Sequence, residues 1–339
     1  MREDGMKYTK LGKSNLTVSK ICLGTMHFGP RTSQDDAFKI MDRALEMGIN
    51  FFDTANVYGG VEDRGRSEII IGNWFKQDLR NRDRVVLATK VYGVMTNQDL
   101  PNEQRGISAY KVRKHLEGSL KRLKTDHIDL YQVHHIDKTV TPEEFWGIFD
   151  RLVADGKVLY IGSSNFPGWG LAVHQMQALQ RGSLGFISEQ TMYNLLCRYP
   201  ELEVLPAAQA LGIGVIPYMP LAGGLLTGKI KSVPGSRTSE VEREYGITLD
   251  ESNQRMAAFS TLCQELGEKE HIVAIAWTLA HPAVASPIVG IRTLEQLEGL
   301  ERAAELVLDA ETLQRLDELF RPNHGRPLRV GPAPEAYAW

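Results

Sequence analysis

The chain has 339 residues, 42% of them hydrophobic and 24% charged, and its formal net charge is −3. Such values are ordinary for a soluble globular protein, and they give no electrostatic reason to expect binding to nucleic acid or to an anionic membrane. The three cysteines lie far apart and form no CxxC pair, so the sequence indicates neither a disulfide framework nor a metal site.

The N-terminal stretch MREDGMKYTK is charged and lacks the apolar core of a signal peptide. No uninterrupted apolar run approaches the roughly 18 residues that a membrane span needs. With so few cysteines, these features predict a cytoplasmic protein in a reducing setting, without a membrane anchor.

In chain order, two short strand-like pieces come first, within residues 7–20, and the turn residues between them predict a hairpin. A short apolar run followed by a helical pattern then recurs eight times. The predicted strands are Ile21–Gly24, Ile49–Phe52, Val85–Thr89, Ile128–Val133, Val158–Gly162, Phe186–Ser188, Ile213–Tyr218 and Ser286–Val289. The predicted helices are Asp35–Met47, Arg66–Phe75, Ala109–Leu123, Pro142–Ala154, Leu171–Arg181, Leu202–Leu211, Asn253–Leu266, Ile272–Ala280, Leu294–Ala304 and Ala310–Phe320.

Strands that alternate with helices must run parallel, because each helix carries the chain back across the sheet. Eight such units close into a barrel. An open, doubly wound sheet is the alternative, but the first turn, GTMHFG, lacks the GxGxxG phosphate fingerprint. We therefore expect residues 1–339 to form one α/β domain, a (β/α)8 TIM barrel with an N-terminal β-hairpin and an extra C-terminal helix. Residues 222–251, rich in Gly, Ser and charge, predict a mobile loop.

Polar residues stand at or just after the ends of three successive predicted strands: Asp53, Lys90 and His134. All strand ends of a parallel barrel meet at one rim, where barrel chemistry occurs, so these side chains are expected to lie together. Tyr58 follows Asp53 by five residues. A lysine beside a tyrosine lowers the tyrosine pKa from roughly 10, and a nearby histidine can donate to a developing oxyanion. The four side chains predict a proton donor for a carbonyl oxygen, with the electrons supplied by a cofactor.

Seven stretches of the sequence, in order, carry a family resemblance: INFFDTANVYG, VVLATK, DHIDLYQVH, IGSSNF, SEQTMYN, GVIPYMPLAGGLLTGK and IVGIRTLEQLE. The set resembles the aldo-keto reductase family and covers nearly the whole chain. The resemblance implies a (β/α)8 barrel that reduces aldehydes and ketones with NADPH. It also implies that Tyr58 is the general acid, assisted by Asp53, Lys90 and His134.

The resemblance further implies the cofactor contacts. The carboxamide of the nicotinamide maps to Ser164, Asn165 and Gln190, and the aromatic residue that stacks on its ring maps to Tyr218. The pyrophosphate maps to main chain near Met219, Leu221 and Gly223, and to Lys229. Gly290, Arg292 and Gln296 map to the adenosine 2′-phosphate, which an arginine pairs with in bidentate fashion. The chain departs from the family pattern at Gly299 and Leu300, where Glu and Asn are common.

The substrate pocket is expected to be lined by Met26, Phe28, Tyr92 and His135, a mixture that suits small-molecule carbonyl compounds with apolar or aromatic bodies. Adjacent residues of a strand face opposite sides, so only one of His134 and His135 is expected to point inward. The family pattern selects His134.

Two other functions remain open from the sequence. Some relatives of this barrel, the potassium-channel β subunits, hold the cofactor as regulatory subunits. An aldolase that uses Lys90 as a Schiff base is a third hypothesis, which the sequence supports poorly because an aldolase would not need the predicted cofactor residues. A basic stretch on one predicted helix is interpreted as a solvated face without a partner; its members are Lys111, Arg113, Lys114, Lys121, Arg122 and Lys124. The oligomeric state is not predicted.

Overall fold

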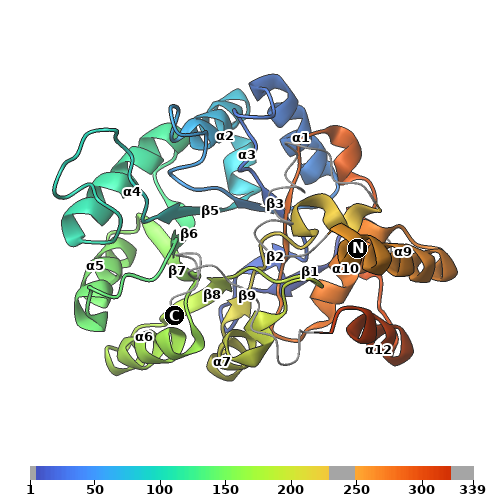
Figure 1. Cartoon of the computed structure of the whole chain (residues 1–339). Helices are drawn as coiled ribbons and strands as arrows, with labels where there is room; N and C mark the ends of the chain where they lie inside the picture. Colours follow the sequence, from blue (N-terminus) through green and yellow to red (C-terminus); the bar gives the residue numbers. More distant parts are fainter. Residues whose placement is uncertain (1–4, 229–248, 322–339) are drawn as a thin grey trace.

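Eight parallel strands form the centre of the molecule, and helices surround them (Figure 1). The computed structural model describes residues 5–228 and 249–321. The strands follow one another around the sheet in the order β10-β3-β4-β5-β6-β7-β8-β9. They are β3 Cys22–Gly24, β4 Phe51–Asp53, β5 Val86–Val91, β6 Ile128–Val133, β7 Val158–Ser164, β8 Phe186–Gln190, β9 Gly214–Val215 and β10 Ile288–Gly290.

Hydrogen bonds close the sheet between β9 and the segment that leads into β10. The amide of Val215 donates to the carbonyl of Ala283, and the amide of Ile288 donates to the carbonyl of Pro217, both at 2.8 Å. Isolated parallel bridges join the same segments. The predicted (β/α)8 fold is therefore confirmed, and all eight predicted strands are present at nearly the predicted positions.

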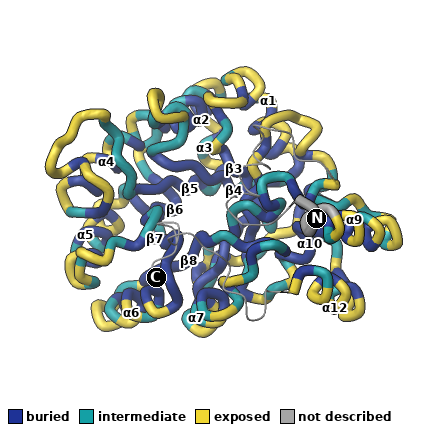
Figure 2. Tube along the Cα trace, in the orientation of Figure 1, coloured by how far each residue is buried: buried dark blue, intermediate teal, exposed yellow. Residues whose placement is uncertain are grey.

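The helices pack their apolar faces on the outside of the strands and leave their polar faces to solvent (Figure 2). Ser33, Ser108 and Thr141 cap three of them, because each side chain accepts a hydrogen bond from an amide three residues later. The α-helices are α1 Gln34–Glu46, α2 Arg66–Gln77, α3 Arg80–Asp83, α4 Ala109–Leu123, α5 Pro142–Ala154, α6 Gly168–Gln180, α7 Val204–Leu211, α9 Leu249–Leu266, α10 Glu270–Ala280, α11 Leu300–Glu305 and α12 Ala310–Leu319. Three 3₁₀ turns are η1 Tyr199–Leu202, η2 Ala222–Thr227 and η3 Leu294–Leu297.

The predicted hairpin, β1 Tyr8–Lys10 with β2 Thr17–Ser19, closes the N-terminal end of the barrel. Leu11 and Val18 are fully buried and pack with side chains of the barrel interior. Gly12 has φ of 55°, and a Cβ there would lie 2.4 Å from the carbonyl oxygen of Ile187, so only glycine allows this close approach. The hairpin therefore covers the end of the barrel opposite the C-terminal rim.

Two local predictions are wrong, and one short helix was missed. The predicted helix Leu294–Ala304 is broken into η3 and α11, since Gly299 adopts a left-handed φ of 82°. The short helix α3 was not predicted. The basic stretch is not uniformly solvated: Lys111 is buried, and Arg122 forms an ion pair with the buried Glu68.

Candidate active site

Three inward-facing polar side chains meet inside the C-terminal rim. Asp53 is the last residue of β4, and Lys90 and Gln132 lie one residue before the ends of β5 and β6. Lys90 and Gln132 are direct partners in the β5–β6 register. Because side chains alternate along a strand, the positions that face the interior are set by this register. Asp53 and Lys90 are close together, as predicted, because they lie at the ends of the neighbouring strands β4 and β5.

The ammonium group of Lys90 has three acceptors, one for each of its hydrogens. It donates to Oδ2 of Asp53 at 2.6 Å, to the carbonyl of Thr54 at 3.0 Å and to the hydroxyl of Tyr58 at 3.2 Å. The side chains of Lys90 and Asp53 are 0% and 3% exposed. A buried charge needs this degree of pairing to be tolerated.

The other oxygen of Asp53 accepts from two amides. Nε2 of Gln132 donates to Oδ1 at 2.9 Å, and Nε2 of Gln190 donates to the same oxygen at 3.0 Å. Gln190 also donates to Oε1 of Gln132. The sequence interpretation missed Gln132. It is a polar side chain near the end of a predicted strand, at the position that pairs with Lys90 of the neighbouring strand, which is the signal that could have identified it.

The charge state of this cluster differs in one respect from the sequence expectation. Burial lowers the pKa of Lys90, but the nearby Asp53 and Tyr58 outweigh this and hold that pKa above its ordinary value. For Tyr58, burial outweighs the Lys90 ammonium, so the pKa of the phenol is raised rather than lowered. Lys90 does lower the pKa of Tyr58, as expected, but burial has the larger effect, so Tyr58 carries its proton at neutral pH.

His134 lies beside Tyr58, and both are half-buried. The two rings meet edge to face, with centroids 5.9 Å apart. Burial, Lys90 and His135 keep the pKa of His134 well below its ordinary value, so the imidazole is neutral. His135 stacks on His134 at 5.2 Å, and both histidines line the cavity. The expected opposite facing fails because β6 ends at Val133, and the alternation ends with it.

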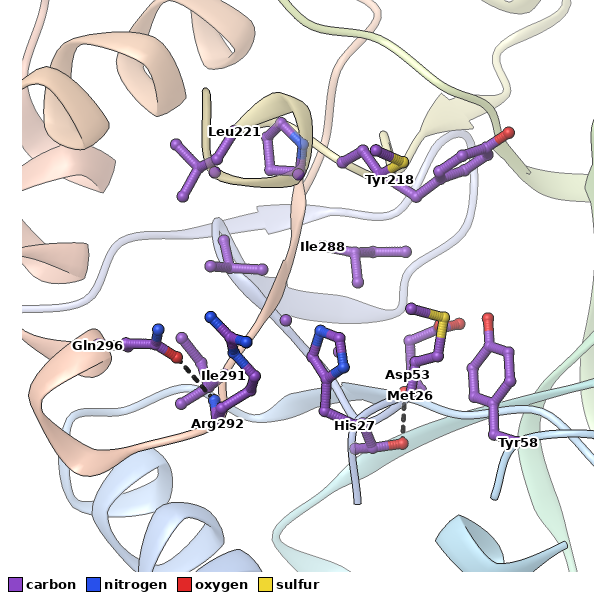
Figure 3. A pocket seen from close by; sticks show the side chains of 18 of the residues that line it. Met26, His27, Asp53, Tyr58, Tyr218, Leu221, Ile288, Ile291, Arg292 and Gln296 are labelled. Atoms are coloured by element: carbon purple, nitrogen blue, oxygen red, sulfur yellow. Dashed lines mark hydrogen bonds between the residues drawn. The ribbon is translucent and has the colours of Figure 1, made fainter. Parts of the chain in front are cut away.

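A cavity of about 570 Å³ extends from this cluster along the rim. In Figure 3, Tyr58, Asp53 and Met26 lie at one end, and Arg292 and Gln296 lie at the other. Tyr218 and Leu221 form the opposite wall. The elongated cavity therefore joins the buried ion pair to an exposed cationic side chain.

A hydrogen-bonded group of side chains lies beside Tyr58. Asn165 has a left-handed φ of 57°, a conformation that asparagine tolerates better than most residues. Its Oδ1 accepts from the Tyr218 hydroxyl at 3.0 Å, and its Nδ2 donates to the carbonyl of His134 at 3.0 Å. Ser164 donates to the carbonyl of Gln190 at 2.9 Å. These contacts fix the polar groups that line the cavity near Tyr58.

The far end is built largely from main chain. Met219, Ala222, Gly223 and Gly224 all have positive φ, which turns the chain tightly along the cavity wall. The amide of Arg292 donates to Oε1 of Gln296 at 2.7 Å, which holds these two residues together. Gly290, Leu221 and Leu300 also line this end. Lys229, which the sequence also placed there, lies outside the described residues, as does most of the predicted loop 222–251.

The predicted substrate side chains divide into two groups. Met26 and His135 line the cavity. The assignment of Phe28 is wrong, because its ring is fully buried in the core, and Phe28 is absent from the described residues that line the cavity. Tyr92 is also absent from that described lining, and instead its ring packs 5.2 Å from His135. Further lining residues were not included in the sequence interpretation, among them His27, Arg31, Thr227 and His271.

Within residues 5–228 and 249–321, no helix is long and apolar enough to cross a membrane. The same residues contain no group of three or more His, Cys, Asp or Glu side chains that could hold a metal ion.

The fold and the site define a (β/α)8 barrel with an elongated ligand cavity at its C-terminal rim. The model of the Aldo/keto reductase family matches residues 20–321, so the chain belongs to that family.

Similar proteins cover the chain almost completely. An uncharacterized oxidoreductase of Bacillus subtilis, YrpG, is 52% identical over 98% of this chain and 100% of its own length. Versiconal hemiacetal acetate reductase of Aspergillus parasiticus is 31% identical over 95% of this chain and 99% of its own. A norsolorinic acid reductase of Emericella nidulans is 32% identical over 93% of this chain and 81% of its own.

Proposed function

We propose that this protein reduces aldehydes and ketones to alcohols with NADPH, and that Tyr58 donates the proton to the carbonyl oxygen. One observation carries the proposal: Lys90 is buried in contact with both Asp53 and Tyr58 at the inner end of the cavity. The names of two relatives, both reductases, support the direction of the reaction. The proposed cofactor supplies the hydride, because none of these side chains is a redox group.

The cavity suits a dinucleotide in shape and in the order of its groups. Ser164, Asn165 and Tyr218 would hold the nicotinamide beside Tyr58. The amide nitrogen of Gln190 is occupied by Asp53 and Gln132, which leaves its oxygen to accept from the carboxamide.

At the other end, the tight turn at Met219, Leu221 and Gly223 would bring main-chain amides to a pyrophosphate, with Lys229 as a further contact. Arg292, with Gly290 and Gln296, would take the 2′-phosphate. A neutral ribose hydroxyl would not require a guanidinium, so Arg292 supports NADPH rather than NADH as the cofactor.

Each side chain of the cluster then has a defined role. Tyr58 holds the transferable proton, and the adjacent Lys90 ammonium stabilises the phenolate that forms when the proton leaves. Asp53 keeps Lys90 charged and oriented. Neutral His134 donates a hydrogen bond to the substrate oxygen as negative charge develops there.

The raised pKa of Lys90 argues against an aldolase, because a Schiff-base lysine must react as the neutral amine. Met26 and His135 lie at the substrate end and suit carbonyl compounds with apolar or aromatic bodies.

The test is steady-state oxidation of NADPH by para-nitrobenzaldehyde, with NADH run in parallel. Turnover with NADPH that exceeds turnover with NADH is the expected result. Saturable NADPH binding without turnover on a panel of aromatic and aliphatic aldehydes would contradict the reductase and favour a regulatory subunit. Absence of binding would contradict the cofactor assignment.

A further inference from the structure

A buried polar chain of three residues lies behind the proposed acid and outside the cavity. Nδ2 of Asn56 lies 3.0 Å from Nδ1 of His115, and Nε2 of His115 lies 2.9 Å from Oε2 of Glu103. The three residues are 0%, 4% and 3% exposed. They come from three parts of the fold: the loop after β4, the helix α4, and the loop that precedes α4.

The chemistry of the groups fixes the direction of these hydrogen bonds. A carboxylate only accepts, so Nε2 of His115 carries the hydrogen that it gives to Glu103. In the neutral imidazole, Nδ1 is then an acceptor, and the amide of Asn56 donates to it. Burial, Lys111 and Arg122 lower the pKa of His115 and outweigh the opposing effect of Glu103, which agrees with the neutral form.

Asn56 stands midway between Asp53 and Tyr58 on the same short loop. The main-chain amide of Asn56 donates to the carbonyl of Lys90 at 3.3 Å. The main-chain amide of Tyr58 donates to the carbonyl of Ala55 at 3.1 Å. The loop is therefore tied to β5 by main chain and to α4 by the Asn56 side chain. After Tyr58 come two glycines with φ of 137° and 96°. On that side the main chain is held by the Tyr58 carbonyl, which accepts from the amides of Gly65 at 3.0 Å and Ser67 at 3.2 Å. The Asn56 side chain is therefore the link of this loop to α4.

The same helix also holds the loop that leads into it. Lys111 is 2% exposed and donates to the carbonyl of Tyr92 at 2.6 Å and to the carbonyl of Gln104. Glu103 accepts from Lys114 in addition to His115. Since the ring of Tyr92 packs on His135, α4 connects the side of the cavity at His135 with the loop that carries Tyr58.

We propose that His115 and Glu103 are positioning residues, which act through Asn56 to hold the Tyr58 hydroxyl within reach of Lys90. The expected effect on the reaction rate rests on the proposed function of Tyr58. The expected effect on the position of the Tyr58 ring does not depend on that function. A misplacement of about 1 Å at a reacting group can cost on the order of a hundredfold in rate. The side chains of Asn56, His115 and Glu103, called the relay below, are absent from the described lining of the cavity, so we expect NADPH affinity not to depend on them.

The test compares two buried histidines on helices. His115→Phe removes both hydrogen bonds of the relay and keeps a ring. His174→Phe is the matched control, because His174 lies on α6, is 5% exposed, and its ring forms a hydrogen bond to the carbonyl of Gly170 and packs against Phe145 and Phe186. Both are measured for kcat, for NADPH affinity, and for the Tyr58 ring signal in NMR of ring-labelled tyrosine, assigned by its loss in Tyr58→Phe.

The expected result for His115→Phe is a kcat lower by about tenfold, or more, with NADPH affinity unchanged and the Tyr58 signal shifted. His174→Phe should keep kcat and the Tyr58 signal. If His115→Phe does not fold, Asn56→Ala removes the same hydrogen bond between Asn56 and His115. The double variant Asn56→Ala/His115→Phe should be no slower than the slower single variant, because the two residues share one link.

A folded His115→Phe protein with wild-type kcat and an unshifted Tyr58 signal would overturn the proposal. Multiplicative losses in the double variant would overturn it as well. If the wild type itself has no turnover, the proposed function fails, and the NMR comparison still decides whether the relay places Tyr58.

Discussion

Removal of the Lys90 ammonium tests how the site is held together. In Lys90→Met, the carboxylate of Asp53 stays buried and keeps only its amide donors, Gln132 and Gln190. An uncompensated buried charge of this kind costs about 3–5 kcal/mol of the free energy of unfolding. Because a domain is stable by only about 5–15 kcal/mol in total, the loss should be large and easily measured.

The assay is urea unfolding at neutral pH, with a control and a second-site variant. Arg181→Met removes the exposed ion pair with Asp150 and should cost less than about 1 kcal/mol. The double variant Lys90→Met/Asp53→Asn leaves no buried charge, so it should be more stable than Lys90→Met. The reasoning would be refuted if Lys90→Met cost no more than Arg181→Met, or if Asp53→Asn destabilised Lys90→Met further.

Two further predictions concern the cofactor and acid pH. Arg292→Ala should weaken NADPH far more than NADH in a fluorescence titration; equal losses would contradict a role on the 2′-phosphate. Burial, Arg105 and Lys90 lower the pKa of His135 from 6.5 to about 4. Between these pH values His135 is protonated in the unfolded chain and neutral in the folded protein. Stability should therefore fall as pH drops from 6.5 towards 4, by about 3 kcal/mol from this residue. His135→Phe should flatten that part of the stability curve, and an unchanged curve would contradict it.

The strands could be predicted because each is a short apolar run followed by a polar residue or a turn. Barrel closure then places the strand ends together, which is why Asp53 and Lys90 could be paired from sequence alone. A helix boundary is harder to predict where the backbone conformation of a single residue determines it. At Gly299, the left-handed conformation interrupts a stretch whose apolar periodicity predicts one continuous helix.

The parts of the site that the sequence interpretation missed depend on packing. Phe28 follows the first strand closely, but its ring turns into the core, and no periodicity predicts that direction. The pKa of Tyr58 depends on the balance between burial and one ammonium group, which needs three-dimensional distances. The relay through His115 was hidden for the same reason, since its three members lie far apart along the chain and are joined only by the fold.

The most direct measurement of the central claim is the comparison of wild type with Tyr58→Phe in NADPH oxidation and NADPH binding. The phenylalanine keeps the ring and removes only the proposed proton. The account predicts that the variant binds NADPH like the wild type and has lost aldehyde reduction. Reduction at a rate near that of the wild type would contradict the assignment of Tyr58 as the acid.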